Sequence, residues 1–247
     1  MKTYGVIFLL LATGWAAVAL HHGGAALWLL WPAVSFFVVA VAYLGAGPGP
    51  FGKRKNGTIA PWALIALLPY TCLAWLTWWI ARASRWEAAC SLVAPNLWIG
   101  RRPAARDLPP AAVILMVDLT CELWEPRRAR RLPGYLCVPT LDYGLPPLQT
   151  LSSLVGRIAA ADGVVLIHCA EGHGRSAAVA AAVLVARGLA PDLPAAERQL
   201  ALARPRVRIN ADQRRGLVAW YENIRRPLKT RTNRATAESR LPRRTEA

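Results

Sequence analysis

Residues 1–83 include no Asp or Glu, which distinguishes this opening stretch from the rest of the chain and indicates a different structural environment. It contains five Lys or Arg and seven of the 11 Trp, whereas residues 84–224 contain 12 acidic residues and 17 Arg. Residues 225–247 carry eight basic residues against two acidic ones. The net charge of +16 therefore combines cations beside apolar segments, a mildly basic domain and a basic tail, and does not indicate one basic face.

Three apolar stretches, residues 4–20, 25–46 and 59–80, make up most of this first region. A helix needs roughly 20 apolar residues to cross the hydrocarbon core of a bilayer, and several Trp lie near the ends of these stretches, where indole rings favour the interface. We therefore predict a membrane region over residues 1–83 with about three transmembrane helices. The first stretch could instead be a cleaved signal peptide, because Lys2 precedes an apolar run that ends in Ala-Val-Ala.

Short strand patterns alternate with helical patterns from residue 90 to residue 226. This alternation predicts an α/β domain with a central, mainly parallel sheet flanked by helices. The expected strands are residues 96–99, 112–119, 135–139 and 164–167, and the expected helices are 148–161, 176–187, 193–203 and 211–224. The tail 227–247 is expected to be basic and disordered. It lacks the interleaved aromatic residues of a nucleic-acid-binding segment, so no nucleic-acid partner is predicted.

The loop after the last expected strand has the most specific sequence, His-Cys-Ala-Glu-Gly-His-Gly-Arg-Ser over residues 168–176. Ligands bind beyond the carboxyl ends of strands in open α/β sheets, and a glycine-rich turn before a helix can direct several N–H groups at an anion. Arg175 adds a planar fork suited to phosphate oxygens, and the same positive field would stabilise a thiolate at Cys169. The loop therefore predicts phosphoryl transfer through a covalent cysteine intermediate.

This loop resembles the signature of the cysteine-based protein phosphatase superfamily, which is His-Cys, five residues, Arg, then Ser or Thr. The resemblance implies that Cys169 attacks phosphorus and that Arg175 binds the phosphate and stabilises the transition state. It also implies that His168 helps to keep the thiol ionised and that Ser176 assists release of the cysteine. The residues expected to bind the substrate phosphate are Ala170, Glu171, Gly172, His173, Gly174 and Arg175.

The reaction also needs a general acid, because an alkoxide or phenoxide leaves poorly without a proton. Asp142 is the predicted acid, since it follows an expected strand and lies in a Gly/Pro-rich loop on the N-terminal side of Cys169. The acid of the dual-specificity branch occupies such a loop at a similar distance from the cysteine. Asp118, which also ends an expected strand, is interpreted as a structural or capping residue, with a catalytic role as the alternative.

The resemblance extends over residues 95–224, and this compact length is similar to the dual-specificity-like branch. The resemblance implies a protein tyrosine or dual-specificity phosphatase. A lipid phosphatase acting on a phosphatidylglycerophosphate-like monoester is the alternative, and a non-catalytic phosphate-binding module is a third. No Lys lies between Cys169 and Arg175, and Glu171 at the rim would repel polyanions, unless its side chain simply points to solvent.

The five cysteines include no Cys-x-x-Cys pair, and their number is odd, so neither a disulfide framework nor a zinc site is predicted. No metal or cofactor is expected. The need for a reduced thiol favours the cytoplasmic side for the catalytic domain. Cations are nearly balanced across three spans, with Lys2 and Lys53–Lys55 on one side and Arg82, Arg85, Arg101 and Arg102 on the other. Arg- and Ala-rich usage suggests a bacterial inner membrane protein.

Overall fold

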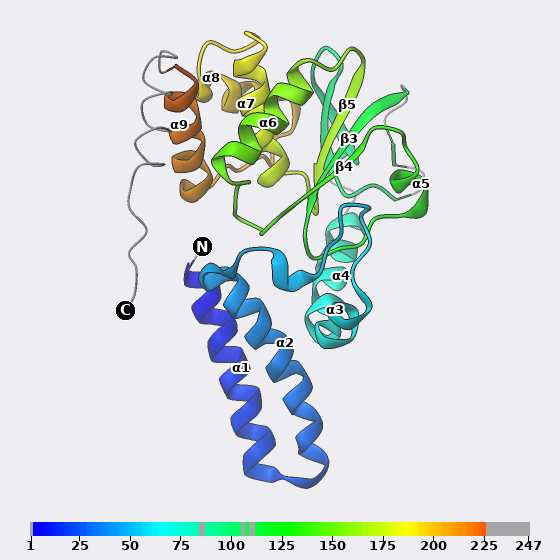
Figure 1. Ribbon diagram of the computed structural model, residues 1–247, viewed down its shortest axis with the longest axis vertical. Coiled ribbons are helices and arrows are strands. Elements are labelled where there is room, and N and C mark those ends of the chain that lie inside the picture. The colour runs from blue at the N-terminus through cyan, green and yellow to red at the C-terminus, as the bar shows by residue number, and fades with distance from the viewer. Residues whose placement is uncertain (1, 84–86, 105–106, 109–111, 226–247) are drawn as a thin grey trace, which may run out of the picture.

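The computed structural model describes residues 2–83, 87–104, 107–108 and 112–225. The expected tail, residues 227–247, lies outside the described residues. Figure 1 shows two parts, an α/β domain and a long pair of helices that projects from it. The expected boundary between an apolar region, residues 1–83, and a catalytic domain, residues 90–226, stays a prediction.

A five-stranded sheet forms the centre of the α/β domain. Its order is β1-β2-β5-β3-β4, and only the β1–β2 pair is antiparallel. The predicted mainly parallel sheet is thus confirmed, with β1 as a strand that the sequence patterns did not indicate. The strands are β1 Cys90–Ala94, β2 Leu97–Arg101, β3 Val113–Thr120, β4 Tyr135–Thr140 and β5 Val164–Cys169.

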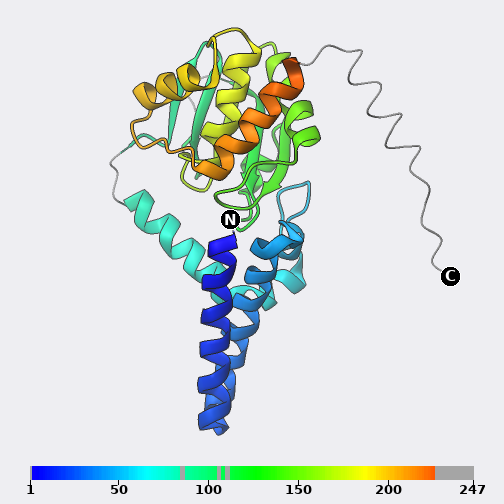
Figure 2. The same cartoon turned by 90° about the vertical axis from the view of Figure 1, so that its left-hand side faces the viewer.

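Four helices cover one face of this sheet and form the main core with it (Figure 2). They are α6 Leu148–Ala159, α7 Arg175–Ala186, α8 Leu193–Ala203 and α9 Ala211–Arg225. Helix α7 is buried along almost its whole length, and its small Ala and Val side chains let it approach both the sheet and the neighbouring helices. The short helix α5, Arg127–Arg130, lies beside the opposite face, where Met116 and Leu166 form a smaller apolar cluster with Ala129.

The first two apolar stretches form a helical hairpin. Helix α1, Lys2–His22, is followed by the 3₁₀ helix η1, Gly24–Leu29, then α2, Leu30–Val41, and the π-helical turn η2, Ala42–Ala46. Gly23 and Gly24 have positive φ angles of 61° and 51°, which glycine adopts without strain, so the chain can reverse within a few residues. Two segments, Lys2–His22 and Gly24–Ala46, are long and apolar enough to cross a membrane.

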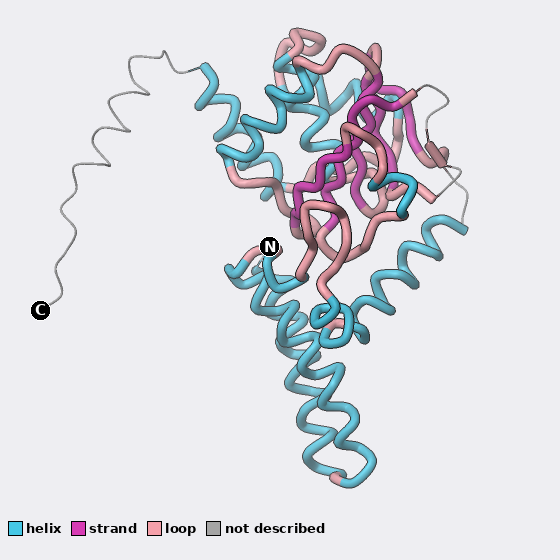
Figure 3. The backbone as a smooth tube through the Cα atoms, turned by 45° about the vertical axis from the view of Figure 1, so that its right-hand side comes forward, coloured by secondary structure: helices cyan, strands magenta, loops and turns pink. Residues whose placement is uncertain are grey.

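The expected third span is not confirmed as one continuous helix. Residues 59–80 instead contain α3, Pro61–Ala66, and α4, Leu68–Ala83, with a break at Leu67. Pro69 has no N–H to donate to the Ile65 carbonyl, and the indole N–H of Trp31 donates to that oxygen instead, at 2.9 Å. In Figure 3 α4 runs obliquely away from the hairpin along the side of the domain.

The loop after the hairpin, residues 47–58, contacts the α/β domain directly. It contains the 3₁₀ turn η3, Gly49–Phe51, and Lys53, whose fully buried ammonium lies 2.9 Å from a carboxylate oxygen of Asp118. The N-terminus also lies beside the domain, and the turn of the hairpin lies at the far end of the molecule (Figures 1 and 2). The expectation that a third span, residues 59–80, places Lys53–Lys55 and the domain on opposite sides of the membrane is therefore wrong, because this loop and the domain touch.

Candidate active site

The cysteine loop joins the end of β5 to the start of α7, as the sequence predicted. Cys169 is 3% exposed, and its Sγ accepts a hydrogen bond from the Gly172 N–H at 3.2 Å and lies 3.5 Å from the Ser176 hydroxyl. Gly172 has a φ of 83°, and a Cβ there would lie 2.4 Å from the backbone of Gly100. Only glycine lets this loop curl tightly enough to direct an N–H at the sulfur.

Arg175 is buried beneath the loop and already has a carboxylate partner. Its two terminal nitrogens donate to the two carboxylate oxygens of Glu122 at 2.9 and 2.6 Å, and one of them also donates to the Thr140 carbonyl at 2.9 Å. Its Nε has no hydrogen-bond partner among the described residues. Glu122 therefore fixes one edge of the guanidinium, while the Nε edge faces a second carboxylate, that of Asp142.

Asp142 faces this same guanidinium from the loop after β4. Its Oδ1 lies 3.2 Å from the Arg175 Nε, and about half of its side chain is exposed into the pocket. Desolvation raises the pKa of the Asp142 carboxyl, and nearby Glu122 adds to this effect, although the positive charge of Arg175 opposes it. A carboxyl with a raised pKa, held beside an anion-binding group, is well suited to donate a proton during the reaction.

A cavity of about 770 Å³ lies in front of these groups, is lined by Cys169, Asp142 and Glu122, and has two different walls. The catalytic wall comes from the α/β domain and includes Cys169, Asp142 and Glu122, with arginines around the rim. The opposite wall comes from the N-terminal region and is mainly aromatic and aliphatic. Its members include Tyr4, Phe8, Tyr43, Tyr70 and Leu73.

His168 points away from the nucleophile. It neighbours Cys169 on β5, and successive side chains of a strand alternate between the two faces of a sheet. Its ring is fully buried and has no hydrogen-bond partner on either nitrogen among the described residues. Desolvation lowers the pKa of His168 to about 4, so the ring is neutral at physiological pH. Its suggested role in keeping the thiol ionised is not supported by a direct contact with Sγ and stays a prediction.

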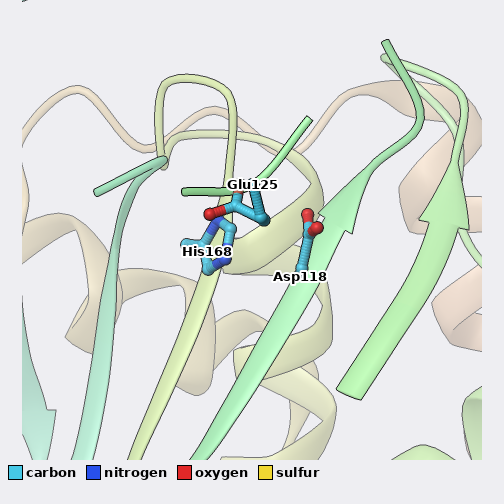
Figure 4. A group of neighbouring side chains, drawn as sticks. All are labelled: Asp118, Glu125 and His168. Carbon is cyan, nitrogen blue, oxygen red and sulfur yellow. The ribbon is translucent and has the colours of Figure 1, made fainter. Parts of the chain in front are cut away.

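The His168 ring faces two buried carboxylates, Asp118 and Glu125, shown together in Figure 4. Their potential ligand atoms lie within 4.8 Å of one another, a grouping that could hold a metal ion. Side-chain cations already neutralise it, however. Lys53 lies 2.9 Å from Asp118, and Arg102 lies 3.3 Å from Glu125. The cluster is therefore better described as a buried ion-pair network than as a metal site.

This network establishes a structural role for Asp118. Its carboxylate accepts hydrogen bonds from the Tyr135 hydroxyl at 2.7 Å and from the Thr120 N–H at 2.8 Å, besides pairing with Lys53. Desolvation alone would raise the pKa of Asp118, but Lys53 holds it well below the usual range. The interpretation of Asp118 as structural agrees with these contacts, since an ionised carboxylate with three partners has no proton to donate.

The rim of the loop contains a second set of ion pairs. His173 Nε2 lies 2.6 Å from a carboxylate oxygen of Glu87, and its Nδ1 lies 3.6 Å from Glu171. Arg204, which is 2% exposed, donates to the Glu171 carbonyl at 3.1 Å and pairs with Glu87 at 3.2 Å. Glu171 does line the pocket, where its carboxylate also contacts the His173 ring, and its repulsion of polyanions stays a prediction.

The structure thus brings together Cys169, Arg175, Asp142 and Ser176, four of the five residues that were expected to act in catalysis. Sequence reasoning missed Glu122, which orients Arg175, and Lys53, which was treated only as a charge beside a membrane span. Glu122 could have been noticed because it follows β3 at the same carboxyl edge of the sheet as the other site residues. Lys53 carried no such signal.

Comparisons with known proteins give structural neighbours only. No protein-family model and no curated protein matches the chain. Among solved structures, human DUSP28 is 28% identical, with 57% of this chain and 97% of that chain covered and a TM-score of 0.48. Tk-PTP in its active form is 26% identical, with 56% and 98% covered and a TM-score of 0.47. PTPMT1 is 22% identical, with 60% and 99% covered and a TM-score of 0.45.

Proposed function

We infer that this chain, which has the fold and the signature loop of the dual-specificity-like branch of the cysteine-based phosphatases, hydrolyses phosphomonoesters through a phosphocysteine intermediate. One observation carries this inference. One pocket is lined by a buried cysteine thiol and by the Asp142 carboxyl, whose pKa is raised by desolvation, and the buried Arg175 guanidinium lies behind this wall with its Nε 3.2 Å from that carboxyl. These are the nucleophile, the anion binder and the proton donor that the reaction requires.

In the first step the Cys169 thiolate attacks phosphorus, a P–S bond forms and the P–O bond to the leaving group breaks. Asp142 gives its proton to the departing oxygen, so an alcohol or phenol leaves. Arg175 stabilises the charge that spreads over the phosphate oxygens in the transition state. In the second step water attacks phosphorus, Asp142 accepts its proton, and Ser176 assists departure of the sulfur as inorganic phosphate is released.

A phosphorylated protein is the substrate class that the family resemblance implies. On this proposal the enzyme acts on phosphotyrosine, with phosphoserine and phosphothreonine as further substrates. The arginines around the rim would contact acidic residues that flank a phosphorylated side chain.

A membrane phosphomonoester, such as a phosphatidylglycerophosphate-like lipid, is the second candidate substrate, and one observation favours it. The pocket wall opposite Cys169 comes from α1, η2 and α4, and it is largely apolar and aromatic. Such a wall would accommodate the glycerol and the upper acyl chain of a lipid while its phosphate reached the cysteine loop. A strongly polar peptide gains less from the same surface.

We propose that the hairpin anchors the enzyme in a membrane. The side chains of Leu10, Trp28 and Phe37 are between half and four-fifths exposed, and both long helices contact mainly each other away from the domain. An exposed apolar surface of this kind is normally covered by lipid. With two spans the N-terminus and the domain would share one side, together with Lys2 and Arg82, which favours the cytoplasm.

The experiment that tests the function uses the full chain in detergent or in vesicles. We expect hydrolysis of an aryl phosphate that is inhibited by vanadate and is absent in Cys169→Ser. Activity that persists in Cys169→Ser would exclude the phosphocysteine intermediate. The same preparation, offered phosphotyrosyl and phosphoseryl peptides and phospholipid monoesters in vesicles, distinguishes the two substrate classes by their relative kcat/KM.

Membrane sidedness is tested separately with topology reporters. A reporter inserted at Gly23, in the turn of the hairpin, and a reporter fused after Ala247 should give opposite results. Identical results from the two positions would contradict a hairpin that crosses the membrane twice.

A further inference from the structure

The proposed acid, Asp142, lies in a tight turn whose backbone is strained. The Gly144 N–H donates to the Leu141 carbonyl at 3.0 Å, which closes a turn over residues 141–144. Tyr143, the residue directly after the acid, has a φ of 61°, a conformation that bulky residues rarely adopt. A residue keeps such a strained conformation only where contacts with its surroundings stabilise it. The contacts that stabilise Tyr143 therefore also determine the direction of the neighbouring Asp142 carboxyl.

The N-terminal helices contact the turn on both sides of the acid. Leu141, which precedes Asp142, is 5% exposed and packs in an apolar cluster with Val39, Tyr43 and Phe51 of the hairpin and the loop after it. Tyr143, which follows Asp142, stacks on Tyr4 of α1, with ring centroids 4.3 Å apart and ring planes 11° from parallel. The acid thus lies between two side chains that are both held by the N-terminal region.

The α/β domain holds the same turn mainly through its backbone. The Asn210 side-chain amide donates to the Tyr143 carbonyl at 2.9 Å, and the Gln213 amide donates to the Gly144 carbonyl at 3.0 Å. Two such bonds restrict the carbonyl edge of the turn but leave the Tyr143 ring free to rotate. The flat stack against Tyr4 supplies the missing restraint, because it fixes the direction of the Tyr143 side chain and with it the rotation of the turn.

We propose that Tyr4 in the first apolar helix is a positioning residue for the reaction, which holds Asp142 in place through the Tyr143 ring. This inference rests on the proposed phosphatase function with Asp142 as its acid. In this arrangement the N-terminal hairpin is part of the catalytic apparatus. Its first helix supports the acid turn, so detachment of that helix from the domain would impair proton donation while leaving the cysteine loop intact.

The test exploits the fact that a proton donor matters most for a poor leaving group. The full-length Tyr4→Ala variant is assayed with p-nitrophenyl phosphate, whose leaving group departs readily, and with a simple alkyl phosphate, whose leaving group needs the proton. We expect kcat/KM, which reports the step in which the leaving group departs, to fall about tenfold or more for the alkyl phosphate and less than about twofold for the aryl phosphate. Equal losses for both substrates would overturn the proposal, since they would indicate general disruption of the site.

Two further variants keep the test decisive if Tyr4→Ala folds poorly. Tyr4→Phe preserves the aromatic stack and should retain the alkyl phosphatase activity. Tyr4→Leu preserves an apolar side chain without a flat ring and should show the selective loss. The proposal is overturned if Tyr4→Leu matches the wild type on the alkyl phosphate.

A double-mutant comparison separates positioning of Asp142 from any other effect of Tyr4. In an Asp142→Asn background the acid is already absent, so Tyr4→Ala should cause no further loss on the alkyl phosphate. Losses that multiply would contradict the proposal. Leu10→Ala, on the same helix but 66% exposed and away from the domain, is the matched control and should leave both activities unchanged. Wild-type aryl phosphatase activity that depends on Cys169 establishes the underlying function independently.

Discussion

The cysteine loop and the acid turn face each other across one pocket, but they are held in different ways. The groups that contact the Cys169 sulfur come from the loop itself, namely the Gly172 N–H and the Ser176 hydroxyl, while Arg204 and Glu87 hold the rim of the loop from within the α/β domain. The acid turn is held by residues far from it in sequence. Tyr4, near the start of the chain, stacks on Tyr143, and Gln213 bonds the turn from α9.

The residues that carry out the reaction and the residues that align them therefore lie in different regions of the molecule. A short segment between a buried strand and a helix supplies both the nucleophile and the groups that bind the anion, and the rest of the α/β domain holds that segment in place. The relative placement of acid and nucleophile depends instead on contacts between the hairpin and the domain. Mutations in the two regions should therefore produce different losses.

The largest effect is expected from Cys169→Ser, which removes the nucleophile but leaves the anion-binding loop. Turnover of an aryl phosphate should fall by at least about 10⁴-fold, because hydroxyl is a far weaker nucleophile at this position. Vanadate binding, measured by calorimetry, should persist. A variant that loses vanadate binding together with turnover would show that the loop itself depends on the thiol.

Lys53→Ala tests the contact between the α/β domain and the loop after the hairpin, residues 47–58. It removes the ammonium that neutralises Asp118 and donates to Thr120 at 2.9 Å. Loss of one partner from a buried ion pair costs about 3–5 kcal/mol of stability, so we expect a large fall in the midpoint of thermal unfolding in detergent. Lys55→Ala is the matched control, since Lys55 is exposed on the same loop and its removal should change stability by less than about 0.5 kcal/mol. Equal midpoints for the two variants would contradict the structural role of Lys53.

Asp142→Asn removes the proton donor and should affect substrates unequally. We expect kcat/KM for an alkyl phosphate to fall about 10³-fold, and much less for a good aryl leaving group. The acid must be protonated to act in this step, so wild-type kcat/KM for the alkyl phosphate should decline as pH rises through the pKa of Asp142, which desolvation raises above its ordinary value. This basic limb should disappear in Asp142→Asn. A limb that remains would assign the proton to another group.

The smallest effect concerns the buried, neutral His168. Its pKa is lowered from 6.5 to about 4 in the folded chain, so between these values the unfolded chain binds a proton that the folded chain does not. Stability should therefore be intact above pH 6.5 and fall towards pH 4, by up to roughly 3 kcal/mol. Thermal unfolding over this range measures the loss. His168→Gln should abolish this dependence, and an unchanged slope in that variant would assign it to other groups.

Much of the α/β domain could be predicted from local patterns. The continuous apolar run at Val164 predicted β5, and the Ala/Val-rich segment after Ser176 predicted α7, because the burial of a strand or helix is recorded in its own residues. The third apolar stretch is not confirmed as one continuous helix, and the reason is physical. Hydropathy describes how apolar a segment is but not its path, and Pro69 lets the segment bend so that α4 follows the domain.

The sequence by itself determined the nucleophile, the phosphate-binding arginine and the apolar character of the N-terminal region. Each of these is encoded within a short segment, by residue type and spacing. Only the tertiary structure decided that Glu122 orients Arg175, that Lys53 is buried beside Asp118 and that Tyr4 stacks on Tyr143. These three contacts join residues that are far apart in the sequence, and no local pattern records which distant surfaces will meet when the hairpin folds against the domain.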